Sequence, residues 1–443
     1  MTASHHSPPH SRALLLLALI AAGVSPAFAQ EDGDNAELMA QVAQLRAQQA
    51  ELARMQQDNE AALRMLEARL GAAPPATATT AAAAATGSAG TTPATVPSVA
   101  DAMASRLKIS GDLRVRSQFE NSNANGRDRT SGQVRGRLAT AFSVNEHVSI
   151  GARLVTGNSD DPRSTDVQLS NWDDDLEVSL DQAYLKLAFD TLDVHAGKIP
   201  QPFTRTELVW DGDVNPQGLS ANWKQSLTGG GTLRANGLFF VIDEQATAAD
   251  STMVGGQLGY DTAALGNWRF DVSAAHYRYN IGSTIGATAT DWRTNLLRPD
   301  GSYLSDFHLN DMIVGASYAG WGERWPLRVV GDYVKNSAAR TDADTGYSVD
   351  MLLGRVQQPG DWRFSYGHAM AEVDSVLTAF SHDNIGFGSN YRMHAFGIDY
   401  VPWSKTTLSA VWYRYRPLSA QYSTAADPSD WLNRFRVALM VSF

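Results

Sequence analysis

From about residue 106 to the C-terminus, apolar and polar residues alternate along segments of about ten residues. In the C-terminal segment, Phe435, Val437 and Leu439 alternate with Arg434 and Arg436. Such alternation places apolar side chains on one face of a β-strand and polar side chains on the other. Two structures fit this pattern: a barrel with one face in lipid and one on a polar lumen, or a soluble β-sandwich.

The lengths of the connections favour the barrel. We predict about sixteen strands, with short connections after the even-numbered ones, such as Asp190-Thr191 and Gly266-Asn267. Most connections after odd-numbered strands are long, such as those at about 199–216 and 280–310. Short periplasmic turns and long external loops are typical of outer-membrane barrels. The predicted fold is therefore all-β, a transmembrane antiparallel up-and-down β-barrel over residues 105–443, preceded by a short α-helical coiled coil.

Tryptophan placement gives a second, independent indication. Five tryptophans lie beside the predicted short turns, where an interfacial girdle needs amphipathic rings at headgroup depth. In a soluble sandwich, tryptophan would more often be a core residue. The five are Trp268, Trp321, Trp325, Trp362 and Trp403.

Residues 1–29 have the pattern of a cleaved export signal. Arg12 supplies positive charge, Ala13 to Val24 form an apolar core, and Ala27-Phe28-Ala29 matches a small-residue cleavage site. The alternative is a membrane anchor, which needs about 20 apolar residues to cross the hydrocarbon. The shorter apolar stretch favours the signal peptide.

Residues 30–71 are predicted to form a periplasmic coiled-coil helix. Leu38, Leu45 and Leu52 recur at heptad spacing, and Gly71 ends the predicted helix. A solvated helix or a partly disordered tail is the alternative. Residues 72–104 are rich in Ala, Thr and Pro and predict a flexible linker.

Composition excludes several classes of protein. The net charge of -11 argues against nucleic-acid binding, which needs a basic face. The chain has no cysteine, which removes disulfides and thiolate metal sites. It also lacks the metalloprotease, nucleophile-elbow and P-loop motifs. We therefore expect no enzymatic activity, no cofactor and no bound metal.

At this point the chain resembles outer-membrane porins, and most closely the family described as putative porins. The resemblance covers about 106–443 and rests on four segments in order: Ile109 to Arg116, Gln182-Ala183-Tyr184-Leu185 running into Ala196 to Pro200, Trp210 to Asp213, and the terminal Phe443. It implies a sixteen-stranded homotrimeric channel in the outer membrane of a Gram-negative bacterium. It also implies contact with outer-membrane lipid and lipopolysaccharide, and recognition of the terminal aromatic residue by the barrel assembly machinery. The coiled coil is similar in placement to that of some sugar-specific porins.

A channel acts through the width of its lumen and the charges at its narrowest point. In trimeric porins the third external loop folds inward, and here that segment, at about 200–217, contains Glu207, Asp211 and Asp213. Our hypothesis is that these acids face a wall of arginines across the constriction. Alternatively, the arginines pair with acids elsewhere in the lumen or line a vestibule. The predicted wall consists of Arg114, Arg116, Arg135, Arg137 and Arg153.

Other charges on the polar face are mostly basic. They are Lys186, Arg269, Asp271, Arg328, Asp332, Arg363, Arg434 and Arg436. We therefore expect the negative charge of the chain to lie outside the lumen, for example at Asp166 in the second external loop. A weak preference for anions follows, because charges near the neck set selectivity.

The sequence thus predicts passive diffusion of small hydrophilic solutes or ions. A different class of function stays open, in which the protein is structural. The predicted helix would span about 50 Å at about 1.5 Å per residue. It could tether the outer membrane to the cell wall or to a periplasmic partner.

Overall fold

The computed structural model describes the barrel region with short gaps. The described residues are 105–121, 127–157, 163–170, 172, 175–282, 294–423, 425 and 427–443. The predicted export signal, coiled-coil helix and linker all lie outside them. No helix in the described part of the chain is long and apolar enough to cross a membrane.

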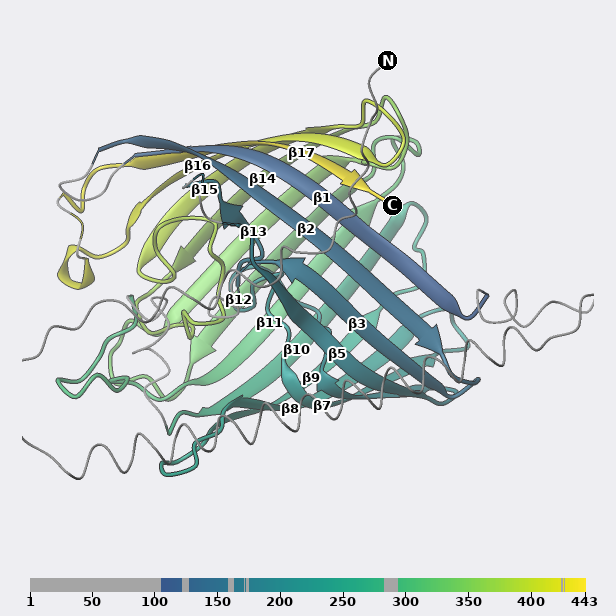
Figure 1. Ribbon diagram of the computed structural model, residues 1–443, viewed down its shortest axis with the longest axis horizontal. Coiled ribbons are helices and arrows are strands. Elements are labelled where there is room, and N and C mark those ends of the chain that lie inside the picture. Colours follow the sequence, from purple (N-terminus) through teal and green to yellow (C-terminus); the bar gives the residue numbers. More distant parts are fainter. Residues whose placement is uncertain are drawn as a thin grey trace, which may run out of the picture. The chain divides into compact units, whose positions relative to one another are not determined.

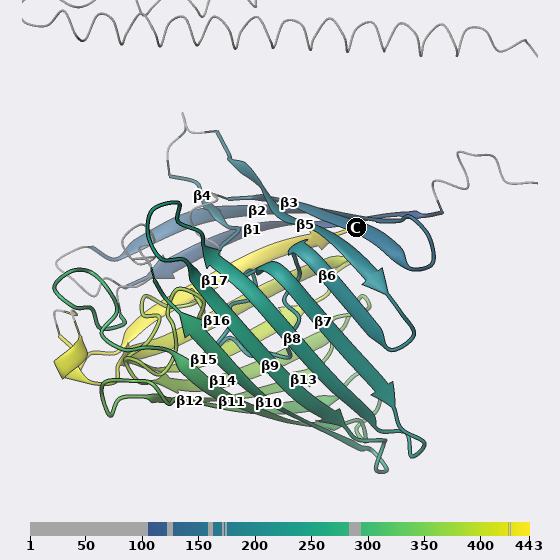
Figure 2. The same cartoon turned by 90° about the horizontal axis from the view of Figure 1, so that it is seen from below.

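Sixteen long strands form one closed antiparallel sheet (Figure 1). β1 (Leu107–Glu120) pairs with both β2 (Arg129–Ser143) and β17 (Leu432–Ser442), so these strands leave no free edge. Figure 2 shows β6 to β9 side by side in one wall. The remaining long strands are β3 (Val148–Thr156), β5 (Val178–Ala188), β6 (Leu192–Lys198), β7 (Gln217–Ser226), β8 (Thr232–Asp243), β9 (Ser251–Asp261), β10 (Trp268–Asn280), β11 (His308–Tyr318), β12 (Leu327–Asn336), β13 (Thr345–Gly354), β14 (Trp362–Ala371), β15 (Tyr391–Tyr400) and β16 (Thr406–Pro417).

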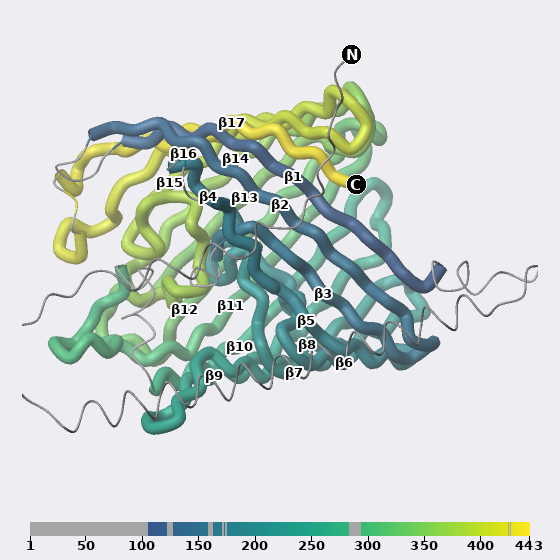
Figure 3. The backbone as a smooth tube through the Cα atoms, viewed as in Figure 1, coloured from purple at the N-terminus to yellow at the C-terminus, as the bar shows by residue number. Residues whose placement is uncertain are grey.

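The topology is a meander in which each long strand pairs with the next one along the chain, as the tube in Figure 3 shows. All sixteen predicted strands are confirmed. A short additional strand was not predicted: β4 (Val167–Gln168) pairs with Gln133 and Val134 of β2. β4 lies in the long connection between β3 and β5, so this connection is held against the barrel wall.

The two ends of the barrel differ, as the sequence predicted. At one end, here called the turn end, the connections are short. The terminal strand also finishes there, since Ser442 N donates to Lys405 O in the β15–β16 turn, and Phe443 N donates to Gly111 O in β1. At the other end, called the loop end, the long connections emerge.

The outer face of the barrel is apolar. In β17, Phe435 and Leu439 are 44% and 42% exposed, whereas the alternating Arg436 is 7% exposed and points inward. Apolar rows of this kind recur on the other strands. A soluble protein rarely exposes so large a continuous apolar surface, which therefore requires an apolar environment.

Aromatic rings border this apolar face at the turn end. Trp362 stacks on Tyr400 with ring centroids 4.4 Å apart, and Trp268 lies 4.7 Å from Tyr318. Trp403, in a turn, is 68% exposed. The arrangement agrees with the predicted girdle.

The buried hydrophobic core lies inside the barrel. Three connections from the loop end, 199–216, 294–307 and 372–390, contribute most of its non-strand residues and pack against inward side chains such as Tyr277 and Met393. Asn295 links two of these connections, because its Nδ2 donates to Val373 O and Val376 O, both at 2.9 Å. The inward-folded loops thus narrow the lumen.

Candidate functional site

The connection 199–216 between β6 and β7 folds into the barrel, as the sequence predicted for the third external loop. Trp210 is fully buried and meets Tyr277 of β10 edge to face, with ring centroids 5.6 Å apart. Phe380, from the connection 372–390, lies 5.7 Å from the same ring. Since Tyr277 faces the interior, this aromatic contact places the loop within the lumen.

Two glycines next to this loop allow its sharp departure from the wall. Gly197 has φ +119° and Gly218 has φ +146°, conformations that other residues rarely adopt. A Cβ on Gly197 would lie 2.3 Å from Ala183 O, and one on Gly218 would lie 2.1 Å from Phe239 O. Each position therefore combines positive φ with close backbone approach.

All five predicted wall arginines sit on the inner face of β1, β2 and β3. Arg114 and Arg116 both pair with Asp166, at 2.6 and 2.7 Å. Arg116 also donates from Nε to Gln133 Oε1 at 2.6 Å. Arg153 pairs with Asp181 of β5, its Nε lying 2.6 Å from Oδ2.

Arg135 and Arg137 share one carboxylate. Both pair with Asp112 of β1 at 2.8 Å, one on each carboxylate oxygen. Arg137 also reaches Asp213 in the inward loop at 3.4 Å. Most of the arginines thus pair with acids other than those of the third loop, which is the alternative that the sequence left open.

Of the three predicted loop acids, only Asp213 contacts the wall. Thr165 Oγ1 donates to its Oδ2 at 3.1 Å, so Asp213 also joins the second and third connections. Glu207 pairs with Arg205 of the same loop at 3.1 Å. Asp211 is buried, and its Oδ1 accepts a hydrogen bond from Asp213 N at 2.8 Å.

Asp211 differs in charge from an ordinary exposed aspartate, which is ionised at pH 7. Burial, followed by the negative charges of Glu207 and Asp383, raises the pKa of Asp211 to about 9. Its carboxyl group is therefore neutral at pH 7. The inward loop presents less negative charge than a count of its acids suggests.

The sequence predicted that Asp166 lies outside the lumen, and this prediction is wrong. Asp166 lies inside the lumen with a side chain 5% exposed, because β4 holds this segment against β2. Burial would raise its pKa, but the hydrogen bond from Arg114 and the charges of Arg116 and Arg114 hold the pKa below its usual value. Asp166 is thus ionised and neutralises part of the arginine wall.

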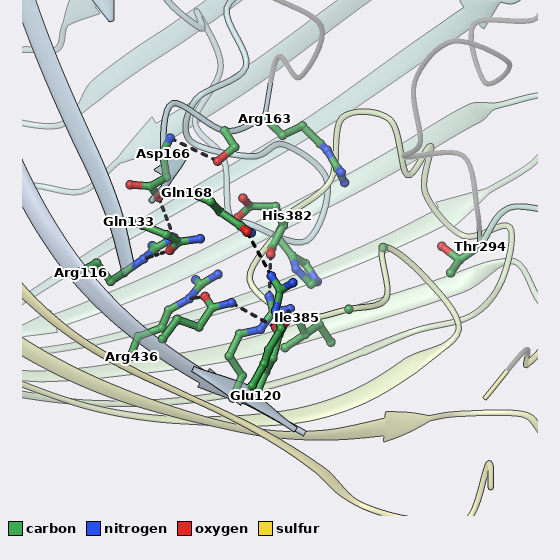
Figure 4. A pocket seen from close by; sticks show the side chains of 17 residues that line it. Arg116, Glu120, Gln133, Arg163, Asp166, Gln168, Thr294, His382, Ile385 and Arg436 are labelled. Carbon is green, nitrogen blue, oxygen red and sulfur yellow. Dashed lines mark hydrogen bonds and ion pairs between the residues drawn. The ribbon is translucent and has the colours of Figure 1, made fainter. Parts of the chain in front are cut away.

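Beside this wall is a cavity of about 380 Å³ (Figure 4). It lies between β1, β2 and β17, the segment 163–168 and the connection 372–390. Five of its lining side chains are arginines and three are carboxylic acids. The arginines are Arg116, Arg129, Arg163, Arg434 and Arg436, and the acids are Glu120, Asp166 and Asp383.

Arg434 and Arg436 of β17 connect the wall to the connection 372–390. Arg434 pairs with Glu120 at 2.7 Å and donates to the backbone oxygens of Asp383 and Asn384, at 3.2 and 3.0 Å. Arg436 donates to Gln118 Oε1 and Asn384 Oδ1, at 2.7 and 2.9 Å. Among the described residues, no carboxylate lies within 4.0 Å of the Arg436 nitrogens.

His382 adds no charge to this cavity. Its ring is buried, and burial together with the positive charges of Arg163, Arg434 and Arg436 lowers its pKa to about 3. Figure 4 shows His382 among the side chains that line the cavity with Arg163. Neutral His382 leaves the arginine excess of the cavity unchanged at pH 7.

Sequence reasoning missed the role of the connection 372–390. Arg434 and Arg436 were predicted to face the lumen, but nothing in the prediction singled out the segment that they hold. A signal was present, since Val376, Leu377 and Phe380 are apolar residues that a solvated loop has no reason to carry.

A closed antiparallel barrel with an apolar outer face and a charged interior has the architecture of an outer-membrane channel protein. Residues 114–298 match the family model described as "Putative porin". The predicted resemblance to that family is confirmed.

Several solved structures match this chain when the structures are compared. They include OmpT of Vibrio cholerae in its trimer form (11% identity, 76% of this chain and 99% of that one, TM-score 0.46) and OmpF of Salmonella typhi in complex with daunomycin (10%, 76% and 97%, TM-score 0.48). The anion-selective porin from Comamonas acidovorans matches with 13% identity, 76% and 99% coverage and a TM-score of 0.46. No curated protein matches the sequence.

Proposed function

We propose that this protein is a passive outer-membrane channel for small hydrophilic solutes or ions, with a weak preference for anions, and that it catalyses no reaction. The observation that carries the proposal is the interior cavity with five arginines against three acids. A fixed excess of positive charge beside the lumen raises the local concentration of anions and lowers that of cations.

The preference is weak because most of the arginines are already paired. Asp112, Asp166 and Glu120 each neutralise at least one guanidinium. The net charge of -11 belongs to the whole chain and does not set the field at the neck. Arg436 stands out, because its hydrogen bonds go to neutral partners.

Single-channel recording in a planar bilayer under a salt gradient tests this function. The refolded protein should give stepwise increases in current as single channels open. Its reversal potential should be displaced toward the equilibrium potential of the anion. Arg436→Gln should reduce the displacement. The matched control is Arg324→Gln at the turn end, whose side chain is 61% exposed, and it should leave the reversal potential unchanged.

A folded barrel that gives no steps would contradict the open channel. Steps with a reversal potential on the cation side would contradict the anion preference alone. Steps that arrive in threes would support a homotrimer, which we propose from the resemblance to porins. Assembly by the barrel assembly machinery, through the terminal Phe443, belongs to the same proposal.

The N-terminal segments keep their predicted roles within this proposal. Residues 1–29 are the export signal, 30–71 the periplasmic coiled coil and 72–104 the linker. A structural role as an envelope tether is the alternative function. Deleting 31–100 separates the two, because a channel keeps its conductance, whereas loss of a tether releases or blisters the outer membrane.

A further inference from the structure

Three arginines project from the outside of the barrel near its loop end. Arg392 lies on β15, and Arg414 and Arg416 lie on β16. Their neighbours Tyr391 and Tyr415 are buried in the interior core, so strand alternation directs the arginines outward. Arg392 and Arg416 are directly opposed in the sheet register.

These arginines gather around one aromatic ring. The guanidinium carbons of Arg414 and Arg416 lie 5.2 and 5.0 Å from the centroid of Trp431. His394, which is opposite Arg414 in the register, lies with its ring centroid 5.7 Å from that of Trp431. Its ring also stacks on His368 at 4.6 Å. We call these six residues, Arg392, Arg414, Arg416, Trp431, His368 and His394, the arginine–tryptophan patch.

Within the described part of the chain, no ion pair compensates the positive charge of the patch. Among the described residues, no carboxylate oxygen lies within 4.0 Å of a nitrogen of Arg392, Arg414 or Arg416. Nε of Arg392 is buried and has no hydrogen-bond partner among the residues that the structure describes. Like charges on neighbouring strands repel, and a buried charged donor without a partner is costly. An external anion would remove both penalties.

The position of the patch identifies the kind of anion. Toward the turn end, the outward residues next to the patch on β15 and β16 are Phe396 and Trp412, 44% and 39% exposed, with rings 5.5 Å apart. The patch therefore borders the apolar band of the barrel on the side of the long loops. Further round the sheet from β16, past β17, the outward residues Phe119 of β1, Val134 of β2 and Leu154 of β3 are apolar, so the row of arginines does not continue onto these strands.

We propose that the arginine–tryptophan patch binds the phosphate groups of a glycolipid headgroup in the outer leaflet. Guanidinium groups bind phosphate through paired charge-assisted hydrogen bonds, and Trp431 fixes the two β16 arginines beside the apolar band. The acyl chains of the same lipid would cover Phe396 and Trp412. This inference rests on the proposed outer-membrane location, in which the loop end faces outward.

The test is lipid retention by the full-length refolded protein in detergent, measured by native mass spectrometry. The probes are bisphosphorylated lipid A, its dephosphorylated form and inorganic phosphate. Wild-type protein should retain bisphosphorylated lipid A and bind the other two at least about tenfold more weakly, because each lacks either the charge-assisted phosphate contacts or the acyl chains beside them. Replacing all three arginines by glutamine should abolish the retention.

A matched control is Arg106→Gln. Arg106 lies at the turn end with its guanidinium 5.2 Å above the Phe142 ring, and so has the same type of aromatic contact at the other rim. This variant should retain lipid A as the wild type does. If the triple variant does not fold, Arg414→Gln alone, at an exposed position, should weaken retention by about tenfold.

Three results would overturn the proposal: equal retention by the triple variant, equal retention of dephosphorylated lipid, or displacement of lipid A by inorganic phosphate at similar concentration. Lipid retention needs no open channel, so its failure is distinct from failure of the channel proposal. A barrel that binds lipid A but gives no conductance would support the patch while contradicting the channel.

Discussion

Arg137 of β2 lies 3.4 Å from Asp213 of the inward loop, its Nη1 facing Oδ1, while its Nε is held by Asp112 at 2.8 Å. This pair is the one direct ionic link between the predicted arginine wall and the predicted loop acids in the described residues. Because Thr165 also donates to Asp213, three separate segments converge on one carboxylate. The wall therefore helps to hold the loop in the lumen as well as supplying charge.

Replacing Asp213 by asparagine should weaken the contacts that Arg137 and Thr165 make with this side chain, while keeping its shape. One negative charge also leaves the lumen, so the reversal potential should move further toward that of the anion. Current traces should show more frequent brief fluctuations as the loop loses its ionic contact. The matched control is Asp306→Asn in the connection 294–307, with a side chain 66% exposed. An unchanged reversal potential in Asp213→Asn would contradict a position near the neck.

The aromatic contact of Trp210 makes a second prediction. Trp210→Ala removes a fully buried ring from contact with Tyr277 and Phe380. Loss of such a side chain costs about 3–5 kcal/mol, and here the loss should fall on the packing of the loop rather than on the barrel. We expect a larger single-channel conductance and faster proteolysis within 199–216. Trp403→Ala, at a 68% exposed turn position, should change neither.

The strands could be predicted because their signal is local. Alternation along β17, for example, follows from neighbouring residues that meet two different environments. The inward course of β4 and Asp166 could not, because it depends on pairing with β2 beyond the end of β3. A sequence pattern fixes which face Arg114 occupies, but not which distant carboxylate will be brought beside it. The same limit explains why the role of Arg436 became visible only with the fold.

The pKa of Asp211 predicts a dependence of loop packing on pH. The folded value of about 9 lies above the ordinary value of 3.8, so the packed loop favours the neutral carboxyl. The stabilising contribution is complete below about pH 4, decreases as the pH rises toward about 9, and is constant above that. Proteolysis within 199–216 should therefore accelerate between these limits.

Asp211→Asn provides the internal reference for this pH dependence. The amide is neutral at every pH, so the ratio of wild-type to variant cleavage rates should rise with pH and level off above about 9. Comparing the two proteins at each pH removes the pH dependence of the protease itself. A ratio that stays constant would show that Asp211 is ionised throughout and that its burial is looser than the structure indicates.

The glycine before the inward loop should tolerate no side chain. At Gly197, φ of +119° and the approach of a Cβ to 2.3 Å from Ala183 O act together, so Gly197→Ala must displace the β5–β6 pairing. Positive φ alone costs about 1–3 kcal/mol in a residue other than glycine. We expect a lower refolding yield and a lower midpoint temperature for loss of the heat-modifiable band on gels. Gly256→Ala in β9, where a Cβ meets nothing within 4 Å, should refold like the wild type. Equal behaviour of the two variants would mean that the loop leaves the wall by a different backbone path.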